Sequence, residues 1–203
     1  DEKSRLFATV MDNSRMRRYI EAAVRTDLAR KMVFLSGPRQ VGKTTLAKAF
    51  MAEFENAQYL NWDVPNDRRI ILNQGWSLRA DLVILDEIHK MRSWKSYLKG
   101  VFDGRSEGQA IIVTGSARMD TYRQSGESLA GRYFAFRLHP VSVREWCRET
   151  SEQPDPALLR LMERGGFPEP LLAEDGRDAA RWRARYLEDM IREDVLDFAR
   201  IHE

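Results

Sequence analysis

The sequence has a single cysteine, Cys147, so no disulfide bond can form within it. Its histidines, His89, His139 and His202, are scattered and have no cysteine companions, which argues against a zinc site. No apolar run approaches the roughly 20 residues that cross a bilayer, and the N-terminal residues do not follow the pattern of a signal peptide. We therefore expect a cytoplasmic protein without a membrane partner.

Neither sign of charge dominates the sequence. Lysines and arginines number 33 and aspartates and glutamates 31, which gives a net charge of +2. This balance gives no support for a nucleic-acid partner, although it does not exclude a local basic patch. A basic cluster between Arg15 and Lys31 favours the solvated face of an amphipathic helix, with phosphate contact as the alternative. The 203 residues, 43% of them apolar, suit one α/β domain with a small appended region.

The stretch LSGPRQVGKTTLAKAF, residues 35–50, carries the most specific motif of the sequence. A short apolar run at 32–35 predicts a buried strand, and apolar residues at helical spacing follow at 46–50. Between them, residues 37–44 match the pattern G-x-x-x-x-G-K-[ST]. A strand, a glycine-bearing loop and a helix are the context in which this pattern predicts a P-loop, which binds nucleotide phosphates. The alternative is a glycine turn that caps an ordinary helix.

Each residue type in this motif has a physical reason. Backbone N–H groups at a helix N-terminus converge on phosphate oxygens, and Gly37 and Gly42 permit the backbone angles and close approach that this requires. We expect Lys43 to contact the β- and γ-phosphates of ATP and the Thr44 hydroxyl to ligate Mg²⁺. The full predicted set of nucleotide-binding residues in this loop is Gly37, Pro38, Arg39, Gln40, Val41, Gly42, Lys43, Thr44 and Thr45.

Further apolar runs predict a sheet that extends beyond this first strand. Four more strands are expected, at 57–64, 80–89, 109–117 and 133–140. Because these strands alternate with helices, the pattern indicates an α/β fold with a parallel sheet between helical layers. We expect a helical lead-in over residues 1–30, with a helix at about 11–30, then a P-loop core over 31–140 and a lid-like helical region over 141–203.

Two adjacent carboxylates, Asp86 and Glu87, end the apolar run LVILDE within the strand predicted at 80–89. Asp86 occupies the position at which a Walker B aspartate holds magnesium, and Glu87 can polarise the water that attacks the γ-phosphate. Alone, two carboxylates at a strand end would be unremarkable. Beside a P-loop they favour hydrolysis over transfer to a second substrate, because small-molecule kinases take their attacking group from that substrate.

Two further candidates come from the segment IIVTGSAR and from the residue before the last strand. Ser116 is the first candidate for a hydroxyl that senses the γ-phosphate, with Thr114 the second and a simple capping role as the alternative. Arg132 is a candidate arginine finger acting across a subunit interface, or else an ordinary surface arginine. With Lys43 and Glu87, Ser116 and Arg132 complete the candidate catalytic residues.

The ordered motifs GPRQVGKTTL, LDEIHK, WKSYLKGVFD, VTGSARMD, GESLAGRYFAFRLHPVS and GGFPEPLL resemble those of prokaryotic AAA+ ATPases near the STAND-type branch. The resemblance covers nearly all of residues 15–200. It implies an AAA+ core with strand order 5-1-4-3-2, followed by a helical region and, in other members, a nuclease-like C-terminal domain. We accordingly expect the chain to be a fragment of a longer protein.

The resemblance also bears on two single residues. Pro168, in the segment GGFP, resembles an element that related ATPases place near the nucleotide, with a turn proline before a helix as the alternative. Ser116 stands where many AAA+ proteins have asparagine and STAND relatives have arginine, which departs from both patterns.

Three functions remain open on the sequence alone. The first is a Mg²⁺-dependent ATPase whose nucleotide state drives a conformational or assembly change, with ATP and ADP as ligands, an unknown protein client and a homo-oligomer as an option. The second is a helicase-like translocase, since DEIH is a D-E-x-H box, but the short spacing from the P-loop argues against it. The third is a nucleotide-binding switch with negligible turnover. A guanine-reading N-K-x-D or T-K-x-D tetrad is missing from the sequence, which argues against a GTPase.

Overall fold

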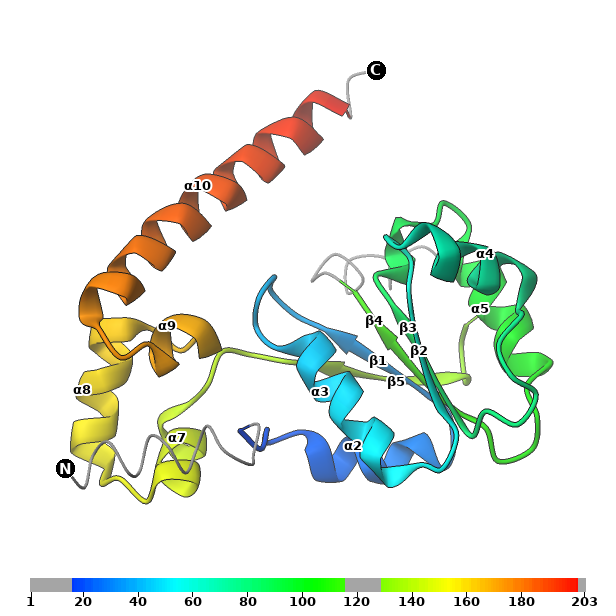
Figure 1. The fold of residues 1–203 in the computed structure, drawn as a ribbon, viewed down its shortest axis with the longest axis horizontal. Helices are drawn as coiled ribbons and strands as arrows, with labels where there is room; N and C mark the ends of the chain where they lie inside the picture. Colours follow the sequence, from blue (N-terminus) through cyan, green and yellow to red (C-terminus); the bar gives the residue numbers. More distant parts are fainter. Residues whose placement is uncertain (1–15, 116–128, 201–203) are drawn as a thin grey trace. The chain divides into compact units, whose positions relative to one another are not determined.

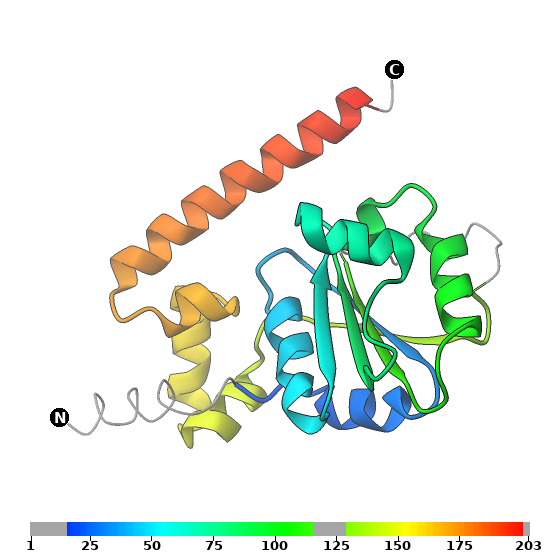
Figure 2. The same ribbon diagram turned by 45° about the vertical axis from the view of Figure 1, so that its right-hand side comes forward.

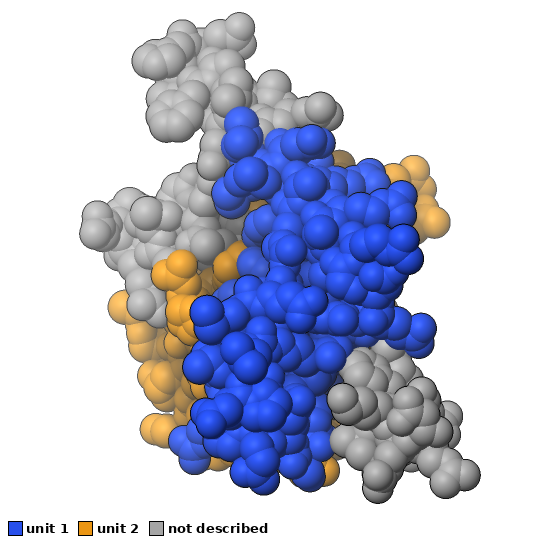
Figure 3. Space-filling view, turned by 90° about the vertical axis from the view of Figure 1, so that its left-hand side faces the viewer, with its two compact units in different colours: residues 1–16, 140–203 blue, residues 17–139 orange. Residues whose placement is uncertain are grey.

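The computed structural model describes residues 16–115 and 129–200, with side chains described as far as residue 191. The chain divides into two compact units, one of residues 17–139 and one of residues 1–16 and 140–203 (Figure 3). Among the helices within the described residues, none has the length and apolar character to cross a membrane.

A five-stranded parallel sheet forms the centre of the unit of residues 17–139, unit 2 in Figure 3 (Figure 1). The strands are β1 (Met32–Ser36), β2 (Ala57–Asn61), β3 (Leu82–Asp86), β4 (Ala110–Thr114) and β5 (Tyr133–Arg137). They lie side by side in the order β2-β3-β4-β1-β5, which confirms the predicted order 5-1-4-3-2. Every residue of β1, β3 and β4 is buried, as expected of central parallel strands covered on both faces.

Helices cover both faces of this sheet (Figures 1 and 2). One layer contains α2 (Glu21–Leu28) and α3 (Lys43–Phe50), and the opposite layer contains α4 (Pro65–Asn73) and α5 (Trp94–Asp103). A short 3₁₀ turn, η1 (Met51–Glu53), extends α3, and a second one, η2 (Ile88–Lys90), follows β3. The layered α/β arrangement that the sequence predicts is therefore confirmed.

The core on the α5 side explains why this helix forms where it does. Trp94, Leu98 and Val101 recur at helical spacing, and all three are buried against sheet residues that include Phe34 and Val83. The Phe34 and Trp94 rings lie 6.0 Å apart between centroids. Removing this apolar stripe from water is what fixes α5 to the sheet.

The first helix of the unit is shorter than the sequence predicts. We expected a helix at about 11–30, but α2 begins at Glu21, and residues 16–20 form no helix; residues 11–15 lie outside the described part of the chain. The physical reason lies at Arg18, whose backbone N–H donates to the Glu21 carboxylate at 2.5 Å and whose carbonyl accepts from the Glu21 N–H at 3.1 Å. These two bonds close a turn ahead of the helix.

The other unit, unit 1 in Figure 3, has helices and connecting segments but no strand among its described residues. Its helices are α7 (Val143–Thr150), α8 (Pro154–Arg164), α9 (Pro168–Leu172) and α10 (Gly176–Arg200). Ser142 and Glu145 form a capping box at the start of α7, and α8 and α9 each begin with a proline, which lacks the N–H that a first turn leaves unused. Trp182 of α10 stacks on Tyr186 with 4.8 Å between ring centroids, and Phe167 packs against both.

Candidate functional site

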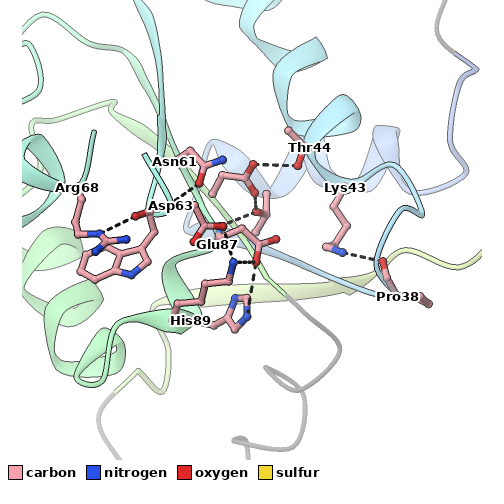
Figure 4. Close-up of polar contacts among 12 residues, drawn as sticks. Pro38, Lys43, Thr44, Asn61, Asp63, Arg68, Glu87 and His89 are labelled. Atoms are coloured by element: carbon pink, nitrogen blue, oxygen red, sulfur yellow. Dashed lines mark hydrogen bonds and ion pairs between the residues drawn. The ribbon is translucent and has the colours of Figure 1, made fainter. Parts of the chain in front are cut away.

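The candidate site lies at the carboxyl ends of β1, β3 and β4, which meet at one edge of the sheet because the strands are parallel (Figure 4). Residues 37–42 connect β1 to α3, Asp86 is the last residue of β3, and Thr114 is the last residue of β4. The topology therefore brings together the loop and the carboxylate that the sequence assigns to one site.

The loop backbone depends on glycine at two positions. Gly37 has φ +147°, and a Cβ atom there would lie 2.4 Å from the carbonyl oxygen of Leu138. Gly42 has φ +98° and is the N-cap of α3, where no side chain among the described residues caps the helix. The N–H groups of the first turn of α3 are thus not capped by a side chain, and a helix N-terminus of this kind attracts anions.

Lys43 lies folded over the loop. Its side-chain Nζ donates to the carbonyl oxygens of Gly37 at 3.0 Å and Pro38 at 2.8 Å (Figure 4), and the residue is 7% exposed. Burial lowers the pKa of the Lys43 ammonium, and the nearby charges of Glu87 and Asp86 act in the opposite direction. An ammonium held by two neutral carbonyl acceptors can exchange them for phosphate oxygens, because charged acceptors make the stronger hydrogen bonds.

Asp86 is 2% exposed and accepts hydrogen bonds from hydroxyl groups on three elements. Thr44 of α3 donates to Oδ2 at 2.9 Å (Figure 4), Tyr59 of β2 donates to Oδ2 at 2.5 Å, and Thr114 of β4 donates to Oδ1. Burial, followed by the hydrogen bond to Asp86, raises the pKa of the Tyr59 phenol, which therefore stays a proton donor. These partners satisfy a carboxylate that would otherwise be costly to bury.

The oxygen atoms around Asp86 suit Mg²⁺. Magnesium takes hard oxygen ligands and is usually held by one or two carboxylates together with substrate phosphates. Asp86 and the Thr44 hydroxyl, 2.9 Å apart, supply such a partial set beside the N-terminus of α3. No cluster of three or more His, Cys, Asp or Glu side chains within the described residues could hold a metal by itself.

Glu87 follows in a left-handed backbone conformation, with φ +59°. Its N–H donates to Thr114 Oγ1 at 3.4 Å, and its Oε2 lies 3.5 Å from Lys90 Nζ and 3.7 Å from His89 Nε2 (Figure 4). Lys90 Nζ also contacts Asp63 Oδ2 at 2.5 Å. Burial lowers the pKa of His89. A non-glycine residue at positive φ is strained, and such strain often accompanies functional positions.

The other predicted site residues are Ser116, Arg132 and Pro168. Ser116 lies outside the described residues, whereas Thr114, the second sensor candidate, contacts both Asp86 and the Glu87 N–H. Arg132 precedes β5, and its guanidinium donates to both carboxylate oxygens of Asp103, at 2.8 and 3.0 Å. Pro168 is the first residue of α9 in the other unit, unit 1 in Figure 3, so its nucleotide contact stays a prediction.

Arg18 belongs to the basic cluster between Arg15 and Lys31, for which the sequence favours a solvated helix face. Arg18 is instead 6% exposed and lies before α2. Its Nη1 donates to the P-loop carbonyl of Val41 at 3.0 Å, and its Nη2 donates to the carbonyl of His139 at 2.5 Å. The guanidinium thus joins the loop to the residues that follow β5. Nothing in the spacing of the basic cluster distinguishes Arg18 from its exposed neighbours.

We expect Arg18→Met to lower the free energy of unfolding by about 2–4 kcal/mol, because it leaves two carbonyls without their charged donor. Chemical denaturation measures this change. Arg25→Met is the matched control: Arg25 is an exposed neighbour on α2 that pairs with Glu53, and its loss should change stability far less. Equal stability of the Arg18 variant and the wild type would contradict a structural role for this arginine.

The fold and the site together define the class of the protein. A parallel sheet in this order, a phosphate-binding loop ahead of α3 and a carboxylate at the end of β3 are the parts of an AAA-type P-loop ATPase. Residues 29–147 match the family described as AAA domain, and the chain belongs to that family.

Two curated relatives and one solved structure illustrate the similarity. The uncharacterized proteins Rv2008c of Mycobacterium tuberculosis and Mb2031c of Mycobacterium bovis are each 29% identical over 184 residues, which cover 88% of this chain. The chain spans 40% of the length of these relatives. The Walker-type ATPase PABY2304 of Pyrococcus abyssi has the same fold, with a TM-score of 0.57 at 16% identity over 92% of this chain and 76% of its own.

Proposed function

We propose that the protein binds and hydrolyses ATP with Mg²⁺ and uses the nucleotide state to drive a conformational or assembly change. The observation that carries this proposal is the 2.9 Å contact between the Thr44 hydroxyl and Asp86 Oδ2 at the N-terminus of α3. It joins the phosphate-binding loop to a buried carboxylate, which is the pairing that a metal–nucleotide site needs.

In this proposal the loop residues 37–45 bind the phosphates of ATP. Their backbone N–H groups and the dipole of α3 stabilise negative charge, and Lys43 Nζ moves from the carbonyls of Gly37 and Pro38 to the β- and γ-phosphates. Thr44 and Asp86 would hold Mg²⁺, which supplies neutralisation of the charge that develops on the phosphates. The oxygen ligands and the uncapped helix end support this assignment.

Glu87 is the proposed general base. It directly follows Asp86, and its side chain is 27% exposed at the edge of the sheet where the loop lies. A carboxylate at this place can orient a water molecule and accept its proton as the water attacks the γ-phosphate. Thr114 binds the Glu87 N–H and Asp86 together, so we propose Thr114, with Ser116, for the sensor role.

The wider setting is part of the same proposal. We propose residues 31–140 as the ATPase core and 141–203 as a lid-like helical region, in a cytoplasmic protein that acts on a protein client, with self-assembly as an option. Pro168 would then contact the nucleotide from the helical region, and Arg132 would act between copies of the chain.

One experiment tests the proposal against its alternatives. ATP turnover by the purified protein is measured with Mg²⁺, alone and with DNA or RNA added. We expect hydrolysis that nucleic acid does not change. Strong stimulation by nucleic acid would favour a translocase, and binding without turnover would favour a switch.

A second prediction addresses the loop itself. We expect Lys43→Ala to weaken ATP binding by about 10- to 100-fold, because a charged hydrogen-bond donor to the phosphates contributes roughly 1.5–3 kcal/mol. Calorimetric titration with ATP measures the change. Lys99→Ala, which removes an exposed lysine from α5, serves as the control and should bind ATP normally. Unchanged affinity in the Lys43 variant would contradict the assignment of the loop.

A further inference from the structure

Tyr59 is a partly buried contact of Asp86 that the proposed function does not use. It lies on β2, where its backbone is paired with Ile84 of β3, while Asp86 is paired with Asn61. The Tyr59 side chain therefore reaches along the sheet towards the carboxyl end of β3, and its hydroxyl donates to Asp86 Oδ2 at 2.5 Å.

The Tyr59 side chain is held on more than one side. Lys48 Nζ of α3 lies 4.0 Å from the centre of the phenol ring, and Asn61 Nδ2 donates to the phenol oxygen at 3.3 Å. A cation over an aromatic face is attractive, and it fixes the ring against α3. The phenol is thus oriented before any ligand binds, which is what a supporting residue of a metal site requires.

We propose that Tyr59 is a positioning residue for the carboxylate of Asp86, and that it thereby sets the magnesium concentration at which the protein binds ATP. This inference rests on the proposed function, in which Asp86 holds Mg²⁺. It adds a residue outside the P-loop, on the edge strand of the sheet, to the groups that determine metal affinity.

The hydrogen-bonding capacity of a carboxylate explains the effect. An ionised carboxylate has about four lone-pair sites. Thr44 and Tyr59 use sites on Oδ2, and Thr114 uses one on Oδ1, which leaves about one site for a further donor such as a metal-bound water. With the phenol present, the Asp86 carboxylate cannot rotate without losing the hydrogen bond from Tyr59. The remaining lone-pair site of the carboxylate therefore points in a fixed direction.

Tyr59 differs from Thr44 in this respect. The Thr44 hydroxyl is itself a proposed magnesium ligand, so its contact with Asp86 changes when the metal binds. Tyr59 has no proposed contact with the nucleotide or the metal. Its contact with the proposed magnesium ligands is the hydrogen bond from its hydroxyl to Asp86 Oδ2. Supporting hydrogen bonds of this kind typically change metal affinity by 10- to 100-fold when they are removed.

The test measures ATP binding by calorimetry at increasing magnesium concentrations, for the wild-type protein and for Tyr59→Phe. The variant keeps the ring and its packing under Lys48 and removes only the hydroxyl. Tyr97→Phe is the matched control, because the Tyr97 hydroxyl makes a bond of the same length, 2.5 Å, to the carbonyl of Ile71, a contact between α5 and α4. Thermal unfolding of all three proteins and ATP binding in EDTA complete the set.

We expect Tyr59→Phe to raise the magnesium concentration for half-maximal ATP binding by about 10-fold, and Tyr97→Phe to leave it unchanged. ATP affinity in EDTA and the unfolding temperature should stay close to those of the control variant. An unchanged or lowered magnesium midpoint would overturn the inference, and so would an equal loss of affinity in EDTA or a melting temperature well below that of Tyr97→Phe. If wild-type ATP binding ignored Mg²⁺, the proposed function would fail as well. A normal wild-type response with an unshifted variant overturns the inference alone.

Discussion

Glu87→Gln is expected to slow ATP hydrolysis by 10²-fold or more while ATP remains tightly bound. The amide keeps the size and the backbone position of the glutamate but cannot accept a proton, and a positioned general base contributes about 10²–10⁴ in rate. A 10²-fold loss corresponds to about 2.7 kcal/mol of transition-state stabilisation. Steady-state phosphate release and calorimetric ATP binding on the same preparation measure the two properties separately.

Asp86→Asn provides the contrast that separates the two neighbouring carboxylates. Asp86 is buried among three hydroxyl donors, so its loss should weaken ATP binding in the presence of Mg²⁺ rather than spare it. Glu107→Gln, an exposed carboxylate outside the site, should leave both properties unchanged. Normal turnover by the Glu87 variant would mean that another group acts as the base.

The ion pairs around Glu87 decide which control the Glu87→Gln variant needs. Its carboxylate lies 3.5 Å from Lys90 Nζ, and Lys90 also pairs with Asp63 at 2.5 Å. These contacts tie the Glu87 side chain to η2, the 3₁₀ turn that follows β3. Substitution by glutamine removes the charge from this ion-pair network and replaces one acceptor oxygen with an NH₂ donor. The melting temperature of the variant is therefore measured as well, and if it is unchanged, a loss of turnover cannot be attributed to unfolding.

The sequence predicts the sheet and the main site because their signals are local. Buried parallel strands are near-continuous apolar runs, so β3 and β4 are visible as the runs LVIL and AIIV. The phosphate-binding loop is likewise specified by a short contiguous pattern, and Gly37 and Gly42 occupy backbone conformations that favour glycine. Asp86 and Glu87 then follow from the end of β3.

The parts that the sequence does not predict depend on contacts between distant segments. Tyr59 reaches Asp86 only because β2 pairs with β3, and Arg18 reaches Val41 across 23 positions of the chain. Tyrosine and arginine at such places have many ordinary structural uses, so their residue types alone carry no signal.

The position of Arg132 determines how it could take part in hydrolysis. β1 and β5 are parallel, with Met32 paired to Tyr133 and Ser36 to Arg137. Arg132 therefore lies at the amino ends of these strands, whereas the loop follows the carboxyl end of β1. About five strand residues separate the two edges, or roughly 17 Å at about 3.3 Å per residue. A guanidinium at this edge is far from the loop of its own chain, so a catalytic role requires a second copy.

The contact between Arg132 and Asp103 is compatible with such a role. It is an exposed ion pair with both guanidinium contacts at about hydrogen-bond length, 2.8 and 3.0 Å. Exposed ion pairs contribute little to stability, so Arg132 can exchange Asp103 for a phosphate of a neighbouring copy at small cost. The planar fork that grips a carboxylate also suits a phosphoryl group.

We expect Arg132→Ala to spare ATP binding and to reduce turnover by about 10³-fold, the scale of an arginine finger acting in trans. Wild-type specific activity should rise with protein concentration, because the finger contributes only when copies meet. Mixing Arg132→Ala with Glu87→Gln protein should restore part of the activity, since a mixed interface can pair an intact base with an intact finger. Asp103→Asn is the control: it removes the resting partner of Arg132 but keeps the guanidinium, so turnover should persist. Normal hydrolysis by Arg132→Ala, or wild-type activity that does not depend on concentration, would return Arg132 to the role of a surface arginine paired with Asp103.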